Sequence, residues 1–492
     1  MRLPSMLGIF AALATSAISA TNSSTPLSKQ ILPSTFKPPQ VFQNVNLVRN
    51  VNLDKGYPRE TINVVVRNID SEPQTDYFIP FDADLMSRIG GLEVRDKKAA
   101  SQPPFKTEII AIESGSQTEY VLVHLSKPLE PKAEITLGIT YTVLSAISPL
   151  PETIEQMGQQ TLLYKTSAYA PSAYSTLKQK TKFKFPTTNI PDYTVIPNKN
   201  SDGGEDPTRQ GSTFTYGPYE NVPASAVQEI SMRYEFTKPL IHVTLLERDV
   251  EVSHWGGNLA TEERFWLGNR AARLKDHFSR VQWQMTQYAS PPTTALKELK
   301  IPLHVGSVDA YFTDDIGNVS TSRFRTNSRE ALLEVKPRYP VFGGWKYSFR
   351  VGWNGGLEKY LRKSKTGDSY VLKVPFMEGP KMNEGVEYER VEVRIILPEG
   401  AQNIKFTTSV PLVKEEITIH KTFMDTLGRP TLKLTALNVV DEWRDRDLIV
   451  TYDYPWTAGY RKPLTIAAGL GSILLAAYLI SSVDTRIGKK QA

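Results

Sequence analysis

Histidines and cysteines are the residues best suited to metal and nucleophilic chemistry. The six histidines are His124, His242, His254, His277, His304 and His420. No two stand at the spacing of a metal-ligand pair, and the zinc-hydrolase pattern His-Glu-x-x-His is absent. The 492-residue chain has no cysteine, which excludes a thiolate nucleophile, a cysteine-ligated metal and a disulfide framework. We therefore expect no catalytic, cofactor-binding or metal-binding residues.

Two Asp-x-Asp sequences match the spacing with which some glycosyltransferases hold a divalent metal on a sugar phosphate. They are Asp82-Ala-Asp84 and Asp445-Arg-Asp447. Arg446 would oppose a cation at the second pair, and neither pair accompanies a nucleotide-binding pattern. We interpret both as solvated residues at strand ends.

Two aromatic segments could bind a ligand or simply pack. In residues 178–185 lysines alternate with other side chains, which fits a strand with one solvated face. The net charge is +6, mostly contributed near the two ends, so the body lacks the basic surface that binds nucleic acid.

The second segment is an aromatic cluster that fits either a core hairpin or a sugar or peptide site. Its members are Tyr339, Phe342, Trp345, Tyr347, Phe349 and Trp353.

Both ends of the chain carry apolar segments of the kinds that direct a protein into and across a membrane. Residues 1–20 combine Arg2, an apolar run and small residues near Ala20, which is typical of a cleaved signal peptide. Residues 463–483 contain no charge, and a helix of that length rises about 31 Å, the thickness of a bilayer core. An entry signal plus one span predicts a single-pass type I membrane protein.

Small residues at i, i+4 spacing form a packing ridge along the predicted transmembrane helix. They are Thr465, Ala468, Gly469, Ser472 and Ala476. Lipid supplies no hydrophobic force between helices, so residues that allow close approach favour helix association. The ridge predicts a partner helix in the membrane.

The predicted topology puts residues 21–460 in the lumen and 484–492 in the cytosol. Lys489 and Lys490 stand fourth and third from the C-terminus, where a dilysine signal returns membrane proteins to the endoplasmic reticulum.

The same topology exposes two Asn-x-Ser sequences to lumenal N-glycosylation. Asn318 lies in a loop-like stretch and is the stronger candidate; Asn22 stands almost at the mature terminus and is the weaker.

The lumenal body is predicted to be mainly β. Residues 61–67, 120–125 and 135–143 are rich in β-branched and aromatic residues between turn signals. Residues 391–397 alternate so that Val391, Val393, Ile395 and Leu397 share one buried face. Helical patterning is confined to patches such as residues 261–275.

The length of the body fits two sandwich-like β modules. After a polar, Pro-rich lead-in at residues 21–40, we place the modules at residues 41–235 and 236–460. RNVNL at 49–53 and RDVEV at 248–252 share a pattern and indicate an internal duplication. The match is short and leaves open whether the modules share one fold.

Five segments in the second module together resemble the ribophorin I family, the large single-span subunit of the eukaryotic oligosaccharyltransferase. They are EVSHWG at 251–256, DIGNVSTS at 315–322, PRYPVFGGWK at 337–346, IILPEGAQN at 395–403 and DTLGRP at 425–430. The layout of signal, body and single span extends the resemblance over the whole chain. The short tail resembles fungal-type members, since animal members continue into a long cytosolic segment.

The resemblance implies a non-catalytic subunit of a complex that transfers a preassembled oligosaccharide from dolichyl diphosphate to Asn in Asn-x-Ser/Thr of nascent polypeptides. Its implied partners are the other subunits, including a multi-spanning catalytic subunit, together with the translocon and nascent polypeptides that the chain would guide. It also implies glycosylation of Asn318. The residues alone leave two alternatives open, which are a lumenal chaperone or cargo receptor and an independent lumenal glycosidase.

Overall fold

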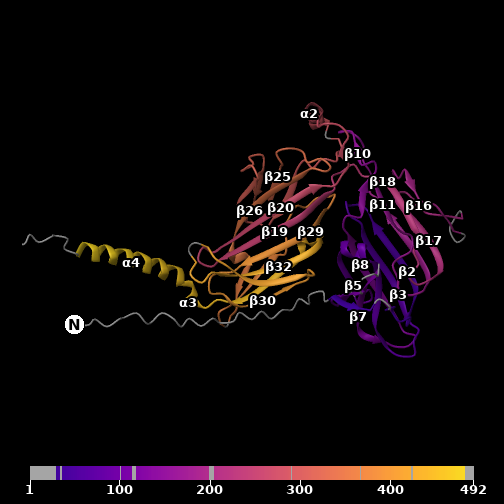
Figure 1. Cartoon of the computed structure of the whole chain (residues 1–492), viewed down its shortest axis with the longest axis horizontal. Helices are drawn as coiled ribbons and strands as arrows, with labels where there is room; N and C mark the ends of the chain where they lie inside the picture. Colours follow the sequence, from indigo (N-terminus) through magenta and orange to yellow (C-terminus); the bar gives the residue numbers. More distant parts are fainter. Residues whose placement is uncertain are drawn as a thin grey trace, which may run out of the picture.

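The computed structural model describes residues 29–33, 36–99, 101–112, 118–198, 204–289, 291–365, 367–422 and 425–482. Strands dominate these residues, which confirms the predicted mainly β body, and one long apolar helix follows it (Figure 1). The predicted signal peptide at 1–20, Asn22 and the tail at 484–492 with Lys489 and Lys490 lie outside the described residues.

The strands from β1 to β18 form what we call the N-terminal unit. Its large sheet runs, in spatial order, β16 (Thr208–Gln210), β17 (Thr213–Val222), β12 (Thr176–Lys184), β2 (Phe42–Asn52), β3 (Arg59–Asn68), β8 (Glu134–Val143) and β5 (Ile89–Asp96). A second sheet is β1 (Lys29–Leu32), β6 (Lys106–Ile112), β7 (Thr118–Leu129) and β4 (Gln74–Asp82), and a third is β13 (Asp192–Tyr193), β18 (Glu229–Glu235), β11 (Thr161–Ser167) and β9 (Ile147–Pro149). The short pair β14 (Ile196–Pro197) and β15 (Glu205–Asp206) and helix α1 (Ala83–Arg88) complete it. Strand β1 lies inside the predicted lead-in and pairs in parallel with β6.

The strands from β19 to β33 form the C-terminal unit. Its large sheet runs β31 (Lys414–His420), β32 (Arg429–Val440), β29 (Val386–Ile396), β19 (Ile241–Ser253), β20 (Asn258–Asn269), β26 (Lys346–Gly356) and β23 (Val308–Asp314). The smaller sheets are β24 (Arg323–Thr326), β25 (Ala331–Val335) and β22 (Leu299–Leu303), and β30 (Gln402–Thr408), β33 (Asp447–Asp453), β28 (Ser369–Pro375) and β27 (Leu361–Lys363). Helix α2 (Arg280–Ala289) and the 3-10 turns η1 (Leu357–Lys359) and η2 (Asp441–Asp445) lie in its connections. Strands β10 (Thr153–Ile154) and β21 (Arg273–Leu274) pair across the two units.

The two units share one strand topology. Each large sheet has a parallel pair at its centre, β2 with β12 and β19 with β29, and the remaining strands follow in the same chain order on either side. Two smaller sheets correspond as well, except that β1 and the short pair β14–β15 have no counterpart in the C-terminal unit. A register shift falls between Asn44 and Asn46 in the first unit and between Val243 and Leu245 in the second. Each shift lies at the same distance before the arginine of the duplicated pattern, Arg49 or Arg248. The short sequence match left open whether the two modules share one fold, and the structure shows that their large sheets have the same strand order.

Side-chain alternation explains why these segments are strands. In β3 every second residue is buried, including Ile62, Val64 and Val66, and the remaining positions are more exposed. On β29, Val391, Val393, Ile395 and the following Leu397 are buried, as predicted. One face of each sheet is thus committed to a hydrophobic core. On β12, Lys178 and Lys184 lie exposed, which confirms the predicted solvated face.

The predicted helical patch at residues 261–275 is wrong. Residues 261–269 belong to β20, and residues 273–274 form β21. Leu259, Thr261, Glu263, Phe265 and Leu267 alternate as buried positions along β20. Good helix formers such as Glu and Arg stand here, but burial against the core at a period of two overrides helix propensity.

The chain leaves the C-terminal unit through two helices without a long connection. Strand β33 ends at Asp453, α3 spans Trp456–Gly459 and α4 spans Arg461–Ser482. Helix α4 therefore begins two residues before the predicted start at Pro463, which a proline in the first turn permits. Its 22 residues are long and apolar enough to cross a membrane.

Candidate functional site

The residues that the sequence singled out for metal chemistry have structural roles. Asp82 caps α1, its carboxylate accepting from the backbone N–H of Asp84 at 2.9 Å. Asp447 pairs with Lys373 at 2.8 Å, and Arg446 pairs with Glu93 at 2.6 Å. Within the described parts of the chain, no three His, Asp or Glu side chains are grouped to hold a metal ion.

His254 illustrates what the histidines do. Its Nε2 lies 2.6 Å from the hydroxyl of Tyr452, and its ring packs against Tyr370 and Tyr454. Burial lowers the pKa of His254 to about 4, so the ring is neutral at neutral pH. The His254 side chain therefore attaches the turn between β19 and β20 to the C-terminal end of β33, where Tyr452 lies.

Most of the aromatic cluster belongs to the core. Phe342, Tyr347, Phe349 and Trp353 are buried, and Phe349 stacks on Phe265 with ring centroids 4.8 Å apart. Of the other two members, Tyr339 is exposed and Trp345 is half-buried. The predicted core position therefore holds for four of the six residues, but the cluster is not a hairpin of its own, because β26 pairs with β20 and β23.

The two β-units meet at an interface made of buried polar contacts. Asp441 in η2 is 5% exposed and accepts from the hydroxyl of Tyr57 at 2.6 Å and from Lys55 Nζ at 3.2 Å. Burial first, and the Asp441 charge second, raise the pKa of Tyr57, so the phenol stays a donor. A second group of contacts joins Arg270 and Ser145 to Glu387; the backbone N–H of Ser145 donates to Glu387 at 2.9 Å.

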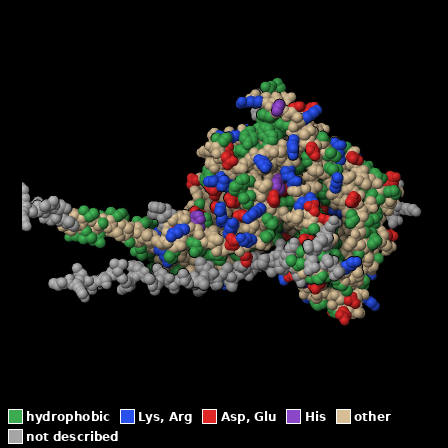
Figure 2. Space-filling model, in the orientation of Figure 1, with side chains coloured by type: hydrophobic (Ala, Val, Ile, Leu, Met, Phe, Trp, Pro, Cys, Tyr) green, Lys and Arg blue, Asp and Glu red, His purple; other side chains and the backbone are tan. Residues whose placement is uncertain are grey.

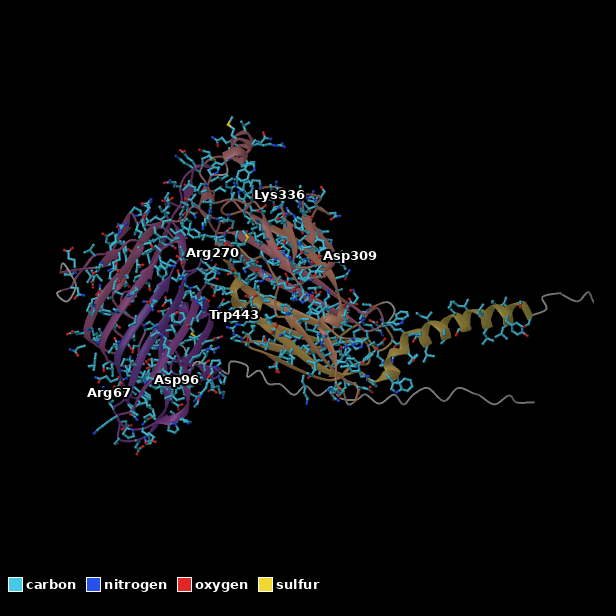
Figure 3. All side chains as sticks on the ribbon, turned by 180° about the vertical axis from the view of Figure 1, so that it is seen from behind. Arg67, Asp96, Arg270, Asp309, Lys336 and Trp443 are labelled. Atoms are coloured by element: carbon cyan, nitrogen blue, oxygen red, sulfur yellow. The ribbon has the colours of Figure 1, made fainter. Side chains whose placement is uncertain are left out.

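Backbone also meets backbone across this interface. A Cβ added to Gly90 would lie 1.9 Å from the carbonyl oxygen of Asn438, so only glycine fits there. Asn438 in turn donates to the carbonyl oxygens of Ser87 and Ile89. Figure 3 labels Arg270 and Trp443 where the two units face one another. Gly90 and Asn438 therefore bring β5 and β32 into direct backbone contact.

A cleft opens between the units on the β9 side of this interface. Its volume is about 700 Å³, and it is lined by β9 and β11 of the N-terminal unit and by β19, β20 and β26 of the C-terminal unit. Trp266 and Trp345 supply aromatic surface, while His242, Arg270 and Lys346 supply polar groups. Aromatic walls with a few polar groups are typical of sites that bind organic ligands or peptide.

Ionic contacts fasten the start of α4 to the C-terminal unit. Lys462 Nζ lies 3.0 Å from the carboxylate of Asp425, whose side chain is fully buried. Burial alone would raise the pKa of Asp425, but hydrogen bonds from Thr422 and the charges of Lys462 and Arg429 hold it well below its usual range. Arg429 also pairs with Glu251 on β19. The anchor helix is thus locked to the large sheet.

A second carboxylate shapes the loop that carries Asp425. Glu399 accepts from the backbone N–H groups of Thr426 at 2.9 Å and Leu427, and from the Thr426 hydroxyl at 2.6 Å. Gly400 has a φ of +97°, and an added Cβ there would lie 2.8 Å from Ala458 in α3. This turn therefore presses against the segment that leads into α4.

The predicted ridge residues lie on α4 and none is covered by the chain itself. They are Thr465, Ala468, Gly469, Ser472 and Ala476. Ser472 Oγ donates to the carbonyl oxygen of Ala468 at 2.7 Å, so its polar group is satisfied within the helix. Figure 2 shows hydrophobic side chains along α4 and Lys and Arg side chains where it meets the β-unit.

Asn318 lies exposed in the turn after β23. Only its carbonyl oxygen is engaged in the described contacts, accepting from Arg338 at 3.0 Å. Arg338 Nε also lies 2.5 Å from the carboxylate of Asp314. Arg338 therefore connects the end of β23 to the turn that carries Asn318.

Sequence reasoning missed the lock residues Asp425, Arg429 and Lys462 as a set. Asp425 and Arg429 stand in the segment DTLGRP, and Lys462 stands beside the apolar run, but nothing in the sequence pairs them. The same is true of Asp441 and Tyr57, because both contacts join residues far apart in the chain.

Comparisons with known proteins agree on one family. The family model described as Ribophorin I matches residues 42–481. Relatives named dolichyl-diphosphooligosaccharide–protein glycosyltransferase subunit 1 include one from Schizosaccharomyces pombe, 31% identical over 90% of this chain and 95% of its own length. One from Caenorhabditis elegans is 29% identical over 86% of this chain and 70% of its own. Subunit 1B from Arabidopsis thaliana is 29% identical over 91% and 92%.

Proposed function

We propose, because this chain belongs to the ribophorin I family, that it is a non-catalytic subunit of the oligosaccharyltransferase complex. The complex would transfer a preassembled oligosaccharide from dolichyl diphosphate to Asn in Asn-x-Ser/Thr of nascent polypeptides. The observation that carries the proposal is the match to glycosyltransferase subunit 1 along nearly the full length of both chains. The molecule's two locked β-units and anchored helix fit a scaffold.

We propose that other subunits hold the chain through α4. All five ridge residues are uncovered on a helix that is long and apolar enough to cross a membrane. Small residues on such a surface allow another helix to approach closely, and a multi-spanning catalytic subunit would supply that helix.

Affinity purification of the tagged full chain in mild detergent tests this role. We expect a multi-spanning partner to be recovered in fixed proportion, and the double variant A468L/S472L to recover less of it. Substitution of Leu474 by Ile on the same helix is the matched control and should leave recovery unchanged. Recovery of the wild-type chain alone would contradict the proposal and favour a chaperone or cargo receptor.

We further propose that the chain is a single-pass type I protein of the endoplasmic reticulum membrane. Residues 1–20 would be the signal peptide, 21–460 the lumenal part and 484–492 the cytosolic tail, with Lys489 and Lys490 as the retrieval signal. Within the lumenal part, the domains would be residues 41–235 and 236–460. The helix that supports this topology is α4. Protease added to sealed microsomes should remove only the tail.

Asn318 is the proposed glycosylation site of this lumenal part. Its exposure on a turn supports access by the transferase, and Asn22 is the weaker second site. Asn318→Gln should abolish a mobility shift on glycosidase treatment, whereas Asn22→Gln should reduce it little.

The cleft between the units is the proposed place where nascent polypeptide is guided. Its aromatic and polar lining supports contact with an extended chain. A photo-crosslinker at Ser348, which lines the cleft, should capture nascent glycoprotein during translocation, while one at the exposed Val227 should not. Equal capture at both positions would contradict the guide role.

A further inference from the structure

The end of the C-terminal unit from which α4 leaves carries exposed large apolar side chains. We name these residues the rim: Trp255, Ile419, Leu427, Trp456 and Tyr460. They come from three separate segments, which are the β19–β20 turn, the β31–β32 region and the α3 segment. Exposed apolar side chains that gather at one end of a domain mark an interaction surface.

Sheet register places the β-strand members of the rim at one end. On the parallel strands β19 and β29, Glu251 stands beside Ile396. Ile396 in turn stands opposite Thr431 on β32, next to Pro430, which faces Ile419 on β31. The ends of four neighbouring strands therefore line up, and Figure 1 shows that α3 and α4 leave from this same side.

The ionic contacts that Asp425 and Arg429 make at the start of α4 fix how far this end of the unit lies from a membrane that α4 crosses. A helix of 22 residues rises about 33 Å, so it must be used almost entirely to cross a bilayer core of about 30 Å. Lys462 in its first turn would then lie at the boundary of the hydrocarbon. Since Lys462 pairs with Asp425, and Arg429 pairs with both Asp425 and Glu251, the adjoining turns lie at the same level.

The turn that carries Trp255 is held firmly in place. Gly257 adopts a left-handed backbone with φ of +61°, and its carbonyl oxygen accepts from Leu357 at 2.9 Å. Gly256 N–H donates to Ser253 Oγ at 3.1 Å, and His254 contacts Tyr452 on the other side. Trp255 is nevertheless 76% exposed. A rigid turn that projects an exposed indole makes the ring available to a partner without an ordering cost.

We propose that the rim is seated in the headgroup layer of the membrane that α4 crosses, with Trp255 as its principal anchor. Indole rings favour this layer because they combine a large apolar face with an N–H donor. Arg461, in the first turn of α4 at the same level, suits phosphate headgroups. The inference rests on the proposed membrane crossing by α4. It places the rim end of the C-terminal unit in contact with the bilayer surface.

Single-cysteine labelling tests this seat, since the native chain has no cysteine. The full chain, reconstituted in phosphatidylcholine vesicles, would carry an environment-sensitive fluorophore at W255C, at I316C or at L475C. Ile316 is the matched control because it is 79% exposed on the same unit, in the turn after β23 that lies toward the other end of the sheet. Leu475 lies midway along α4.

We expect a shallow lipid spin label to quench most of the emission at position 255 and a deep one to quench position 475. Aqueous iodide should quench position 316 alone. Quenching at 475 without quenching at 255 would overturn the seat while leaving the membrane crossing intact. Loss of lipid quenching at 475 would overturn both, and iodide quenching at 255 equal to that at 316 would again reject the seat.

Discussion

The two β-units place an arginine at the same point of the same topology, yet surround it differently. Arg49 on β2 and Arg248 on β19 are both almost fully buried. In the N-terminal unit one carboxylate, Glu60, binds Arg49 Nε at 2.7 Å and Nη2 at 2.8 Å. Tyr141 and Tyr164 donate the remaining hydrogen bonds to Glu60, at 2.6 and 3.1 Å. The pair is neutral and fully satisfied.

The C-terminal unit gives its arginine two carboxylates. Arg248 Nη1 contacts Glu263 at 2.7 Å and Glu378 at 3.2 Å, while its Nε has no hydrogen-bond partner. Glu263 also accepts from the backbone N–H groups of Glu378 and Gly379. The comparison teaches that the shared fold fixes where the buried cation stands and that the neighbouring strand, β3 or β20, supplies one anion in each unit. The second anion of the C-terminal unit, Glu378, comes instead from the connection between β28 and β29.

The pKa values follow this difference. Burial alone would raise the pKa of Glu60, but Arg49 and the hydrogen bonds hold it below its ordinary value. Burial raises the pKa of Glu378, and Arg248 offsets that rise only in part. Glu60 is therefore needed as an anion, and Glu378 is the carboxyl that the fold holds least readily in its charged form.

Glu60→Gln should give the largest effect. It leaves the buried Arg49 without its anion, and breaking a buried pair in this way costs about 3–5 kcal/mol. Hydrogen exchange read by mass spectrometry on the full chain should show faster exchange in β2 and β3 than in β19 and β20. Glu134→Gln is the control, because its pair with Arg67 is exposed and is worth at most about 1 kcal/mol. Unchanged protection of β2 in the Glu60 variant would refute the comparison.

Asp441→Asn should have an intermediate effect, directed at the interface between the units. It removes the charged acceptor of Tyr57 and Lys55, at a cost of about 1–3 kcal/mol. Calorimetry of the full chain should resolve two transitions where the native protein gives a more cooperative one. Asp447→Asn, whose exposed pair with Lys373 lies within the C-terminal unit, is the control and should leave the profile unchanged. A shift of the whole profile without splitting would show that the units do not depend on Asp441 for coupling.

Glu378→Gln should have the smallest effect, and it should depend on pH. Folding raises the pKa of Glu378, so the protonated carboxyl contributes to stability. This contribution to the free energy of unfolding is fully present below the unfolded pKa and is lost as the pH rises through the folded pKa. At pH 4 the free energy of unfolding of the glutamine variant should therefore lie within about 1 kcal/mol of the native value. At pH 7, where native Glu378 loses its proton, the variant should gain stability relative to the native chain. Urea unfolding of both chains at the two pH values checks this. The opposite order would show that Arg248 needs both anions.

Much of this architecture could be predicted from local pattern. The β-branched and aromatic content of residues 61–67, 120–125 and 135–143 identified the β3, β7 and β8 segments. Alternation identified β29, since burial on one face leaves a period of two in the sequence. The paired patterns at Arg49 and Arg248 indicated a duplication, and the two units share the strand order of their large sheets and of two smaller sheets. Pattern failed at β20, where helix-forming residues lie on a strand whose core neighbours decide its state.

The partners of the buried charges could not be predicted. Glu378 contacts Arg248 across a long stretch of chain, and Asp425 meets Lys462 only after the loop folds onto the helix. Charged residues are common and local sequence does not encode which of them converge. The aromatic cluster shows the same limit, because its spacing predicts a hairpin but does not reveal that Trp345 alone reaches the cleft from within it.

The parallel pair at the centre of each large sheet has a consequence for how the chain is made. Strand β2 finds its neighbour only when synthesis has reached β12, and β19 must likewise wait for β29. Until then the hairpin β2–β3 presents an open edge to other chains, with no disulfide to close it. Each unit is therefore expected to mature late and slowly, and its half-built sheet is the stage at which a folding helper would be needed most.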